Sequence, residues 1–427
     1  MSSIDERFYQ LHQKSATISK KSEELFPDGV THDSRKIAPF RVYMDHGLGP
    51  RKWDIDGNEY IDYRTGHGSM ILGQAHPAIV DAVSKQVAKG THLSSSTELE
   101  VKWGDLVTKL VPSAEKVRFV NSGTEAVMMA FRMARVYSGK TNIIKFHNAF
   151  HGWADGPFVG AKGDNEQNGI TQPTRNTITV LPYDISKVET ALNQDDIAAV
   201  IFQGNQVIEP TFIRQLRELT LNTNTILIFD EVVSGFRWSR GGTQELYNVT
   251  PDITTMAKIL AGGLPGGCVA GRADIIDTIA PNKIMHPGTF NANPLSAAAG
   301  ATALEILMNE NVNETADERA SQLKDGLNEL FTKLEINGTA YGVSSIIHVL
   351  FGSDVQCDLT YGPDPNIPEN GHAKEVVELL HRAFINEGLW GNPLSFILSA
   401  THTKQDIEVT LEKYKKVLLN LREEVAI

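Results

Sequence analysis

The feature that most constrains the fold is a series of short apolar runs that alternate with helical stretches between residues 116 and 270. The sequence predicts helices over 124–138 and 211–221, and strands over 116–120, 142–146, 197–202, 225–229, 253–256 and 267–270. Continuous apolar strands separated by helices are typical of a parallel sheet that helices cover on both faces. We therefore expect an α/β protein with a mostly parallel central sheet.

The segments that flank this series have a different pattern. Residues 4–26 are predicted to form one polar amphipathic helix, residues 27–50 a loop, and Asp56-Gly57 the turn of a hairpin. Further helices are expected over 77–90, 97–111, 295–309, 314–334, 372–387 and 404–423, and a strand pair near 339–351. We expect a large domain over 64–310 and a smaller α+β domain over 311–427, which the N-terminal segment 1–63 joins.

Charge and composition exclude several classes of function. The net charge of -12 argues against non-specific nucleic-acid binding, which needs a basic surface. The two cysteines, Cys268 and Cys357, are far apart, so we expect neither a disulfide framework nor a metal site. No stretch approaches the roughly 20 apolar residues of a membrane span, and the N-terminus has no apolar core of signal-peptide length. We expect a cytoplasmic protein that binds small molecules.

A first chemical motif is Phe119-Val-Asn-Ser-Gly-Thr-Glu-Ala126, where a strand ends and a helix begins. Free N–H groups and the dipole at a helix N-terminus bind anions, so Ser122, Gly123 and Thr124 are candidates for a phosphate site. The alternative is an ordinary helix cap made by Ser122 or Thr124.

A second motif is Ile226-Leu-Ile-Phe-Asp-Glu-Val-Val-Ser-Gly-Phe-Arg237. It places Asp230 at the carboxyl end of a strand, where ligands bind in open α/β folds. A carboxylate there can hold a pyridinium nitrogen protonated, or it can bind a metal or cap a helix. A nucleotide hydrolase is a weak alternative, because the only near match to a phosphate loop, at 134–141, leaves a helix and enters a strand.

A third motif surrounds Lys258, which lies between apolar residues and the glycine-rich turn 262–267. Most lysines are solvated, but a lysine held in apolar surroundings has a lowered pKa, as an amine nucleophile requires.

A fourth motif is Phe150-His151-Gly152, whose side chains can stack on a flat ring or simply pack in the core beside a turn. A fifth, His286–Pro294, is a polar turn before a helix. Together, these segments supply a phosphate site, an aromatic ring for stacking, a carboxylate for a ring nitrogen and a lysine. These are the groups that one cofactor needs.

In their order, these segments resemble the class III aminotransferases, a pyridoxal-phosphate family of fold type I, from about Phe26 to the C-terminus. The runs DEVVSGFR (230–237) and AKILAGGLPGG (257–267) carry the resemblance, on the branch that contains glutamate-1-semialdehyde aminomutase. The resemblance implies a fold type I transferase with pyridoxal 5'-phosphate as its cofactor.

The resemblance also implies a role for each site residue. Lys258 looks like the lysine that carries the cofactor as a Schiff base and moves the substrate proton, and Asp230 like the partner of the pyridine nitrogen. Val232 and Phe150 would pack on the ring, with His151 beside them, and residues 122–124 would hold the phosphate. Thr289 resembles a threonine that reaches the phosphate from the partner subunit, which requires a homodimer with shared active sites.

Three features bear on the substrate. Arg35, in Thr-His-Asp-Ser-Arg, resembles a family arginine that binds a substrate carboxylate through two hydrogen bonds, although a solvated arginine is the alternative. Arg41 is a second candidate for that role. His67 falls where the aminomutase has a tryptophan of the pocket wall, and it can equally be structural. Gln203-Gly204 replaces the Glu-Pro of many relatives, and Gln203 or Asn205 can bond the cofactor's phenolic oxygen.

The function expected from these residues is transfer of an amino group from an amine or an amino acid, including β-amino acids, to a keto acid acceptor. An intramolecular aminomutase, which needs no separate acceptor, remains an alternative. So does an amino-acid racemase of the same fold. A non-catalytic binding protein with a degenerate site is the alternative from another class, and the presence of both Lys258 and Asp230 argues against it.

Overall fold

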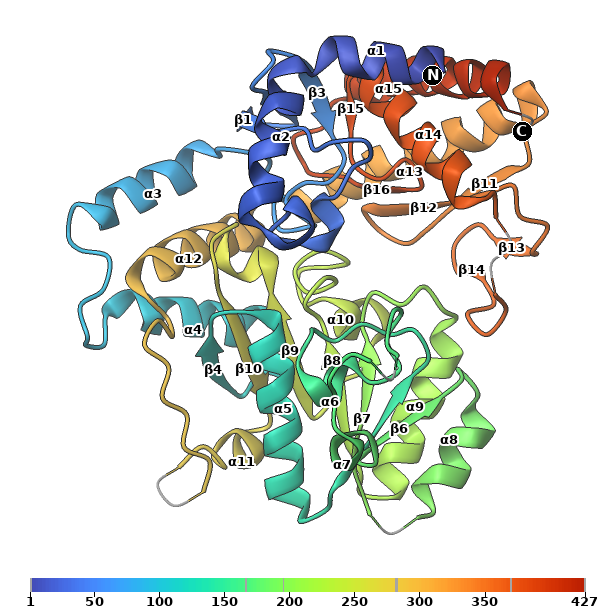
Figure 1. The fold of residues 1–427 in the computed structure, drawn as a ribbon. Helices are drawn as coiled ribbons and strands as arrows, with labels where there is room; N and C mark the ends of the chain where they lie inside the picture. Colours follow the sequence, from blue (N-terminus) through green and yellow to red (C-terminus); the bar gives the residue numbers. More distant parts are fainter. Residues whose placement is uncertain (1, 166, 195, 281–282, 369–370, 426–427) are drawn as a thin grey trace.

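A seven-stranded sheet forms the centre of the protein (Figure 1). The computed structural model describes residues 2–165, 167–194, 196–280, 283–368 and 371–425. In spatial order the strands are β4 (Lys116–Val120), β10 (Gly267–Gly271), β9 (Ile253–Ala257), β8 (Ile226–Asp230), β7 (Ile197–Gln203), β5 (Asn142–Phe146) and β6 (Ile178–Leu181). Pairing is parallel from β9 to β6, whereas β10 is antiparallel to both of its neighbours. The predicted α/β class and mostly parallel sheet are confirmed, and β6 was not predicted.

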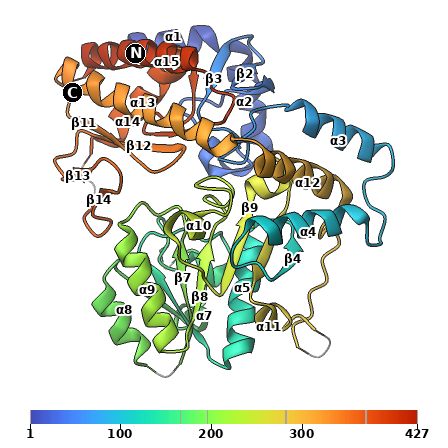
Figure 2. The ribbon, with the colours of Figure 1, turned by 180° about the vertical axis from the view of Figure 1, so that it is seen from behind.

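Helices cover both faces of this sheet. Successive strand residues point to opposite faces, and both sets of side chains are apolar, so each face is buried under helices. On one face, α5 (Gly123–Ser138) packs against Ile143, Ile201 and Ile228, and on the other, α8 (Ile185–Leu192) and α9 (Pro210–Asn222) pack against Ile144 and Phe229. Figures 1 and 2 show α5 and the α8–α9 pair from these two sides. The strands therefore need to be apolar along their whole length, as the sequence has them.

The part of the sheet formed by β4, β10 and β9 is covered by α4 (Glu98–Leu110) and α12 (Pro294–Asn309), which pack through Trp103 and Leu304. Helix α3 (Pro77–Val87) packs on α12. Short elements complete this part of the chain: α6 (Asp155–Phe158), α7 (Gln172–Arg175), α10 (Thr243–Tyr247), η3 (Lys258–Ala261) and α11 (Ala273–Ile276). All but α11 lie between consecutive strands of this sheet, and η3 begins with Lys258.

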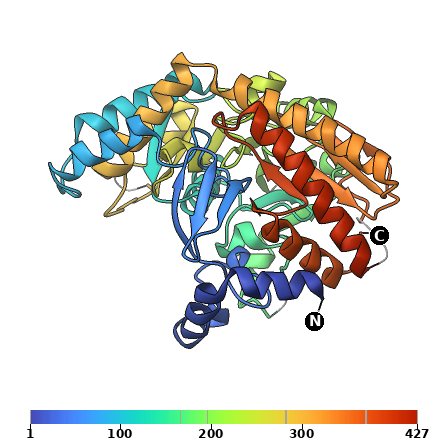
Figure 3. The same cartoon turned by 90° about the horizontal axis from the view of Figure 1, so that it is seen from above.

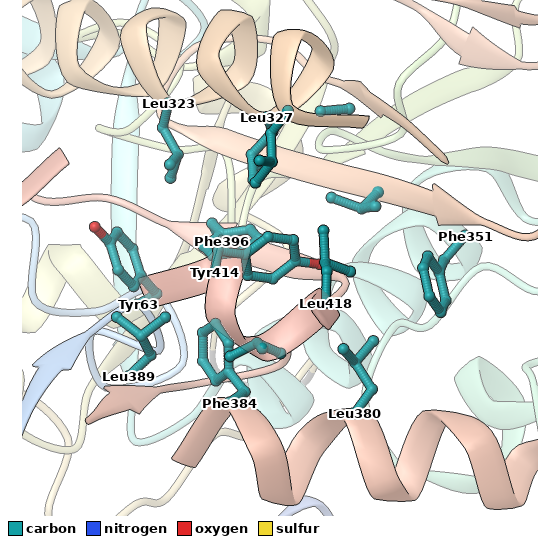
Figure 4. Close-up of a cluster of buried hydrophobic side chains, with 14 of the residues drawn as sticks. Tyr63, Leu323, Leu327, Phe351, Leu380, Phe384, Leu389, Phe396, Tyr414 and Leu418 are labelled. Carbon is teal, nitrogen blue, oxygen red and sulfur yellow. The ribbon is translucent and has the colours of Figure 1, made fainter. Parts of the chain in front are cut away.

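The N-terminal and C-terminal segments share one hydrophobic core (Figures 3 and 4). Ile4, Ile61 and Tyr63 pack with side chains of α13 (Val312–Leu334), α14 (Lys374–Asn386) and α15 (Lys404–Glu424). The strands of this part are β1 (Met44–Leu48), β2 (Arg51–Asp54), β3 (Glu59–Asp62), β11 (Gly338–Tyr341), β12 (Ile346–Phe351), β13 (Cys357–Asp358), β14 (Gly362–Pro363), β15 (Leu389–Trp390) and β16 (Ser395–Ile397). The predicted domain limits at 63/64 and 310/311 stay a prediction.

Two local expectations for the N-terminal segment are wrong. The single helix expected over 4–26 is two helices, α1 (Ser3–Leu11) and α2 (Gln13–Leu25), that meet at His12. The buried His12 ring bonds the Phe8 carbonyl and the Tyr60 hydroxyl, which fixes this break. The expected loop over 27–50 contains β1 and two short 3-10 helices, η1 (Pro27–Gly29) and η2 (Asp33–Arg35). The hairpin at Asp56-Gly57 is confirmed as β2 and β3.

Candidate active site

Lys258 lies at the point where the buried strand β9 ends and η3 begins. Its backbone has a φ of 54°, a left-handed conformation that is strained for a residue with a side chain. Burial lowers the pKa of the Lys258 amine, the charge of Asp230 raises it, and the guanidinium groups of Arg237 and Arg64 lower it. The balance favours a neutral, nucleophilic amine more than an exposed lysine does.

Asp230 lies on the neighbouring strand, at the carboxyl end of β8, and is 4% exposed. Its Oδ1 accepts hydrogen bonds from the Val232 N–H at 3.1 Å and from the Thr255 hydroxyl at 3.4 Å. Its Oδ2 is 2.7 Å from Nδ1 of His151. These contacts fix the carboxylate at the edge of the sheet where parallel α/β folds bind ligands.

His151 is buried behind this carboxylate. Burial lowers the pKa of the His151 ring, and the hydrogen bond to Asp230 partly opposes that effect. Because a carboxylate only accepts hydrogen bonds, Nδ1–H is the donor in this pair. The other ring nitrogen, Nε2, is buried without a hydrogen-bond partner among the described residues.

The N-terminus of α5 lies beside these residues. Ser122 is its N-cap and accepts a hydrogen bond from the Glu125 N–H, so the capping alternative is correct for Ser122. A Cβ on Gly123 would lie 2.8 Å from a Val232 methyl carbon, and Gly152 packs equally closely on Thr124. Within the described chain, the N–H groups of residues 123 and 124 have no partner in the first helical turn. They are available to an anion.

Phe150 and Gln203 lie next to Asp230 at the end of β7, the strand beside β8. Gln203 pairs with Asp230 in the sheet register, and its Oε1 accepts a hydrogen bond from the Phe150 N–H at 2.7 Å. The Phe150 ring is 54% exposed and meets Phe158 edge-on. The structure thus brings together the residues predicted at positions 122–124, 150, 151, 203, 230, 232 and 258.

The residues predicted to contact substrate come from the N-terminal segment and from the loop 64–67. Arg35 and His67 line one cavity, and the Arg35 guanidinium donates to the Thr31 hydroxyl. The His67 ring stacks on His32 and is 2.8 Å from the Ser34 hydroxyl. Arg41 is buried and bonds Glu23 and the Asp28 carbonyl, which makes it a structural residue rather than a free carboxylate binder.

Thr289 lies apart from the other predicted residues. It is in an exposed turn before α12, and its carbonyl accepts a hydrogen bond from His92. The side chains of Met285 and Phe290 on the same segment are 81% and 58% exposed. No contact in the described part of the chain joins Thr289 to the Lys258 site.

Sequence reasoning missed four residues near this site. Thr255 bonds Asp230, and Arg64 lines the cavity beside His67. Arg237 is fully buried and donates to Ser345, to the Leu398 carbonyl and to the Gly68 carbonyl. Lys145 is fully buried in β5, and its amine donates to the Pro157 carbonyl. A charged residue inside a strand predicted to be covered on both faces was the available signal for Lys145.

Two other readings of the sequence can be compared with the structure. The phosphate-loop alternative at 134–141 fails, because α5 ends at Ser138 and the chain then enters β5 instead of leaving a strand. In the described part of the chain, no helix is both long enough and apolar enough to cross a bilayer. Among the same residues, no cluster of three or more His, Cys, Asp or Glu is arranged to hold a metal ion.

Comparison with known proteins places these motifs in a family. The profile of the family "Aminotransferase class-III" matches residues 33–418. Glutamate-1-semialdehyde 2,1-aminomutase of Methanococcoides burtonii is 36% identical over 420 residues, which cover 94% of this chain and 98% of that protein. An ω-transaminase from Sphaerobacter thermophilus superposes with a TM-score of 0.86 at 32% identity, over 96% of this chain and 98% of that one. A transaminase with PLP bound superposes with a TM-score of 0.87 at 27% identity, over the same shares.

Proposed function

The chain belongs to the class III aminotransferases, and we propose that it moves an amino group from an amine or an amino acid, including β-amino acids, to a keto acid acceptor. The family resemblance expected from the sequence is confirmed, and the family is pyridoxal-phosphate-dependent. The observation that carries the proposal is the placement of Lys258 at the end of β9, next to β8, whose end carries the fixed Asp230 carboxylate.

The residues at this edge fit pyridoxal phosphate. Asp230 offers a buried carboxylate for the ring nitrogen, the free N–H groups of Gly123 and Thr124 offer an anion site, and Lys258 offers an amine. The absence of a side chain at Gly123 lets α5 approach Val232, whose branched side chain suits one face of a flat ring. When bound, the cofactor supplies a carbonyl that condenses with amines and a protonated ring that withdraws electrons.

Each residue of the chain then has a task. Asp230 holds the proton on the ring nitrogen, and His151 keeps that carboxylate in place from behind. The α5 N-terminus binds the phosphate through backbone N–H groups and its dipole. Lys258 takes a proton from the substrate carbon that bears the amino group and returns it to the cofactor side. Its lowered pKa leaves the amine unprotonated more often than an exposed lysine at the same pH, as a base requires.

We also propose a homodimer in which Thr289 of each subunit completes the phosphate site of the other. Support comes from the exposure of Thr289 and of the neighbouring Met285 and Phe290, and from the separation of Thr289 from the Lys258 site of its own chain. Analytical ultracentrifugation tests the dimer. Mixing of Lys258→Ala and Thr289→Val chains tests sharing, since mixed dimers should regain one intact site and a fraction of the activity.

A donor and acceptor screen tests the proposed reaction. The purified protein with pyridoxal phosphate should change its near-visible absorbance when an amino donor is added, and recover it when a keto acid follows. If recovery of the absorbance requires the keto acid, the protein is a transaminase. With a racemase, the substrate would lose its optical activity and no keto acid would form. A protein that fails to bind pyridoxal phosphate at all would contradict the proposal.

An intramolecular aminomutase is the second candidate, favoured by the identity to the Methanococcoides burtonii enzyme across nearly the whole chain. It would convert glutamate 1-semialdehyde with no separate acceptor. Turnover of that single substrate, compared with turnover of a donor and acceptor pair, decides between the two reactions.

A further inference from the structure

A cavity of about 640 Å³ lies between the N-terminal segment, the loop 64–67 and residues 381–392. Four of the described residues that line it, Arg35, Arg41, Lys52 and Arg64, carry a fixed positive charge, and none is acidic. The chain as a whole has a net charge of -12. A cavity wall of one sign, opposite to that of the protein, concentrates ligands of the other sign.

Two of these four charges are neutralised by carboxylates of the protein. Arg41 forms a salt bridge with Glu23. Lys52 forms one with Asp62, at 3.0 Å between Nζ and Oδ2. These two side chains therefore serve the fold and have little charge left for a ligand.

The other two guanidinium groups have no such partner. Arg64 makes no salt bridge or side-chain hydrogen bond with any residue that the structure describes, although it is only partly exposed. Arg35 donates one hydrogen bond, to the neutral Thr31 hydroxyl. Arg237 differs from both of them. It is fully buried, and its two terminal nitrogens donate to the Ser345 hydroxyl and to two backbone carbonyls. Arg64 and Arg35 keep most of their five donors free.

These two free guanidinium groups line the same cavity as His67. The loop that carries Arg64 and His67 leads into Met70, whose side chain packs on Gly263 in the turn after Lys258. The charge of Arg64 lowers the pKa of the Lys258 amine, which agrees with this packing. Burial, followed by the charges of Arg64, His32, Lys258 and Arg35, lowers the pKa of His67 to about 3. His67 is therefore neutral near pH 7 and adds no charge to the cavity wall.

We infer that the cavity binds a substrate with two carboxylates, one held by Arg64 and the other by Arg35. The substrate class is an amino acid with an acidic side chain, or the corresponding keto diacid. Each guanidinium can bind a carboxylate through two parallel hydrogen bonds, a geometry that a lysine cannot provide. This inference rests on the proposed function for the identity of the reacting group, and the cavity can be tested without it.

Calorimetry on the cofactor-loaded protein tests the inference with unreactive probes. Glutarate carries two carboxylates, and glutaramate replaces one of them by an amide of the same size. We expect glutarate to bind about tenfold tighter or more, because a charged hydrogen-bond pair is stronger than a neutral one. Equal affinities for the two probes would overturn the inference.

Variants assign the two carboxylates to the two residues. Arg64→Gln and Arg35→Gln should each reduce the ratio of the two affinities to about one, and Arg64→Lys should restore only part of it. Arg7→Gln is the control, because Arg7 is exposed on α1 and paired with Glu387. A ratio that survives Arg64→Gln would remove Arg64 from the site. Binding of the two probes is measured without turnover. A failed donor screen would therefore contradict the proposed reaction without changing what the binding ratio says about the cavity.

Kinetics supply a second readout. In Arg64→Gln, the KM for an acidic amino acid should rise at least about tenfold, whereas the KM for butylamine should not change. A rise of equal size for both donors would indicate a general loss of site structure and would contradict a role in carboxylate binding.

Discussion

Replacement of Asp230 by asparagine separates the chemical role of this carboxylate from its structural role. Asparagine has the same size, so the backbone of β8 is not disturbed. Its Oδ1 can keep the hydrogen bonds from the Val232 N–H and the Thr255 hydroxyl, and its Nδ2 can donate to Nδ1 of His151. The His151 ring can take the tautomer this requires, because its Nε2 has no partner among the described residues.

The variant should therefore fold normally, with a free energy of unfolding within about 1 kcal/mol of the wild type. It can no longer hold a proton on the ring nitrogen by charge, and a hydrogen bond to a charged group contributes about 1.5–3 kcal/mol. We expect the rate of the first half-reaction to fall at least about tenfold, and up to about 150-fold, in stopped-flow absorbance. A variant that binds the cofactor and reacts within twofold of the wild type would refute the assigned role.

Three further changes test other parts of the structure. Gly123→Ala should weaken cofactor binding about tenfold or more in fluorescence titration, since its Cβ would lie 2.8 Å from Val232; Gly123→Ala with Val232→Ala should recover most of the affinity, and no recovery would contradict the packing explanation. Burial lowers the pKa of Lys145 to about 8, so the folded state loses its proton first and the free energy of unfolding should rise by about 3 kcal/mol between pH 8 and 10.5 relative to Lys145→Met; urea unfolding that shows parallel pH profiles would contradict this. Arg237→Lys should lower the free energy of unfolding by about 2–3 kcal/mol, because one ammonium cannot reach Ser345, the Leu398 carbonyl and the Gly68 carbonyl together; an unchanged melting temperature would argue against it.

The sheet could be predicted because its strands are buried on both faces and are therefore apolar along their length. The direction of β10 was not predicted from its apolar run. The connection from Ala257 to Gly267 is too short for the crossover that a parallel neighbour needs, so the chain returns antiparallel. Strand β6, Ile178–Leu181, escaped prediction because it is only four residues long, includes a threonine and has one buried residue, Ile178.

The break between α1 and α2 depends on contacts between residues far apart in the sequence. The pattern of residues 4–26 is continuous, and His12 stops the helix through its bond to Tyr60 on β3. The same limit applies to the site. The motif at Asp230 could be found locally, whereas its contact with His151 depends on how β5 and β8 are placed in the sheet.

The substrate side of the site was the hardest to predict. Arg35 was found through a motif, but Arg64 has no motif, and it is distinguished by lining the cavity without a salt bridge to any described residue. Partners become visible only in three dimensions, where Arg41 and Lys52 are neutralised and Arg64 is not.

Peptide mapping after borohydride reduction tests the central claim most directly. The protein is loaded with pyridoxal phosphate, reduced, digested and analysed by mass spectrometry, together with Lys258→Ala as the control. We predict that the cofactor mass is found on the peptide that contains Lys258, and that the variant has neither this adduct nor turnover with a donor and acceptor pair. An adduct on another lysine, or wild-type turnover by Lys258→Ala, would contradict the account.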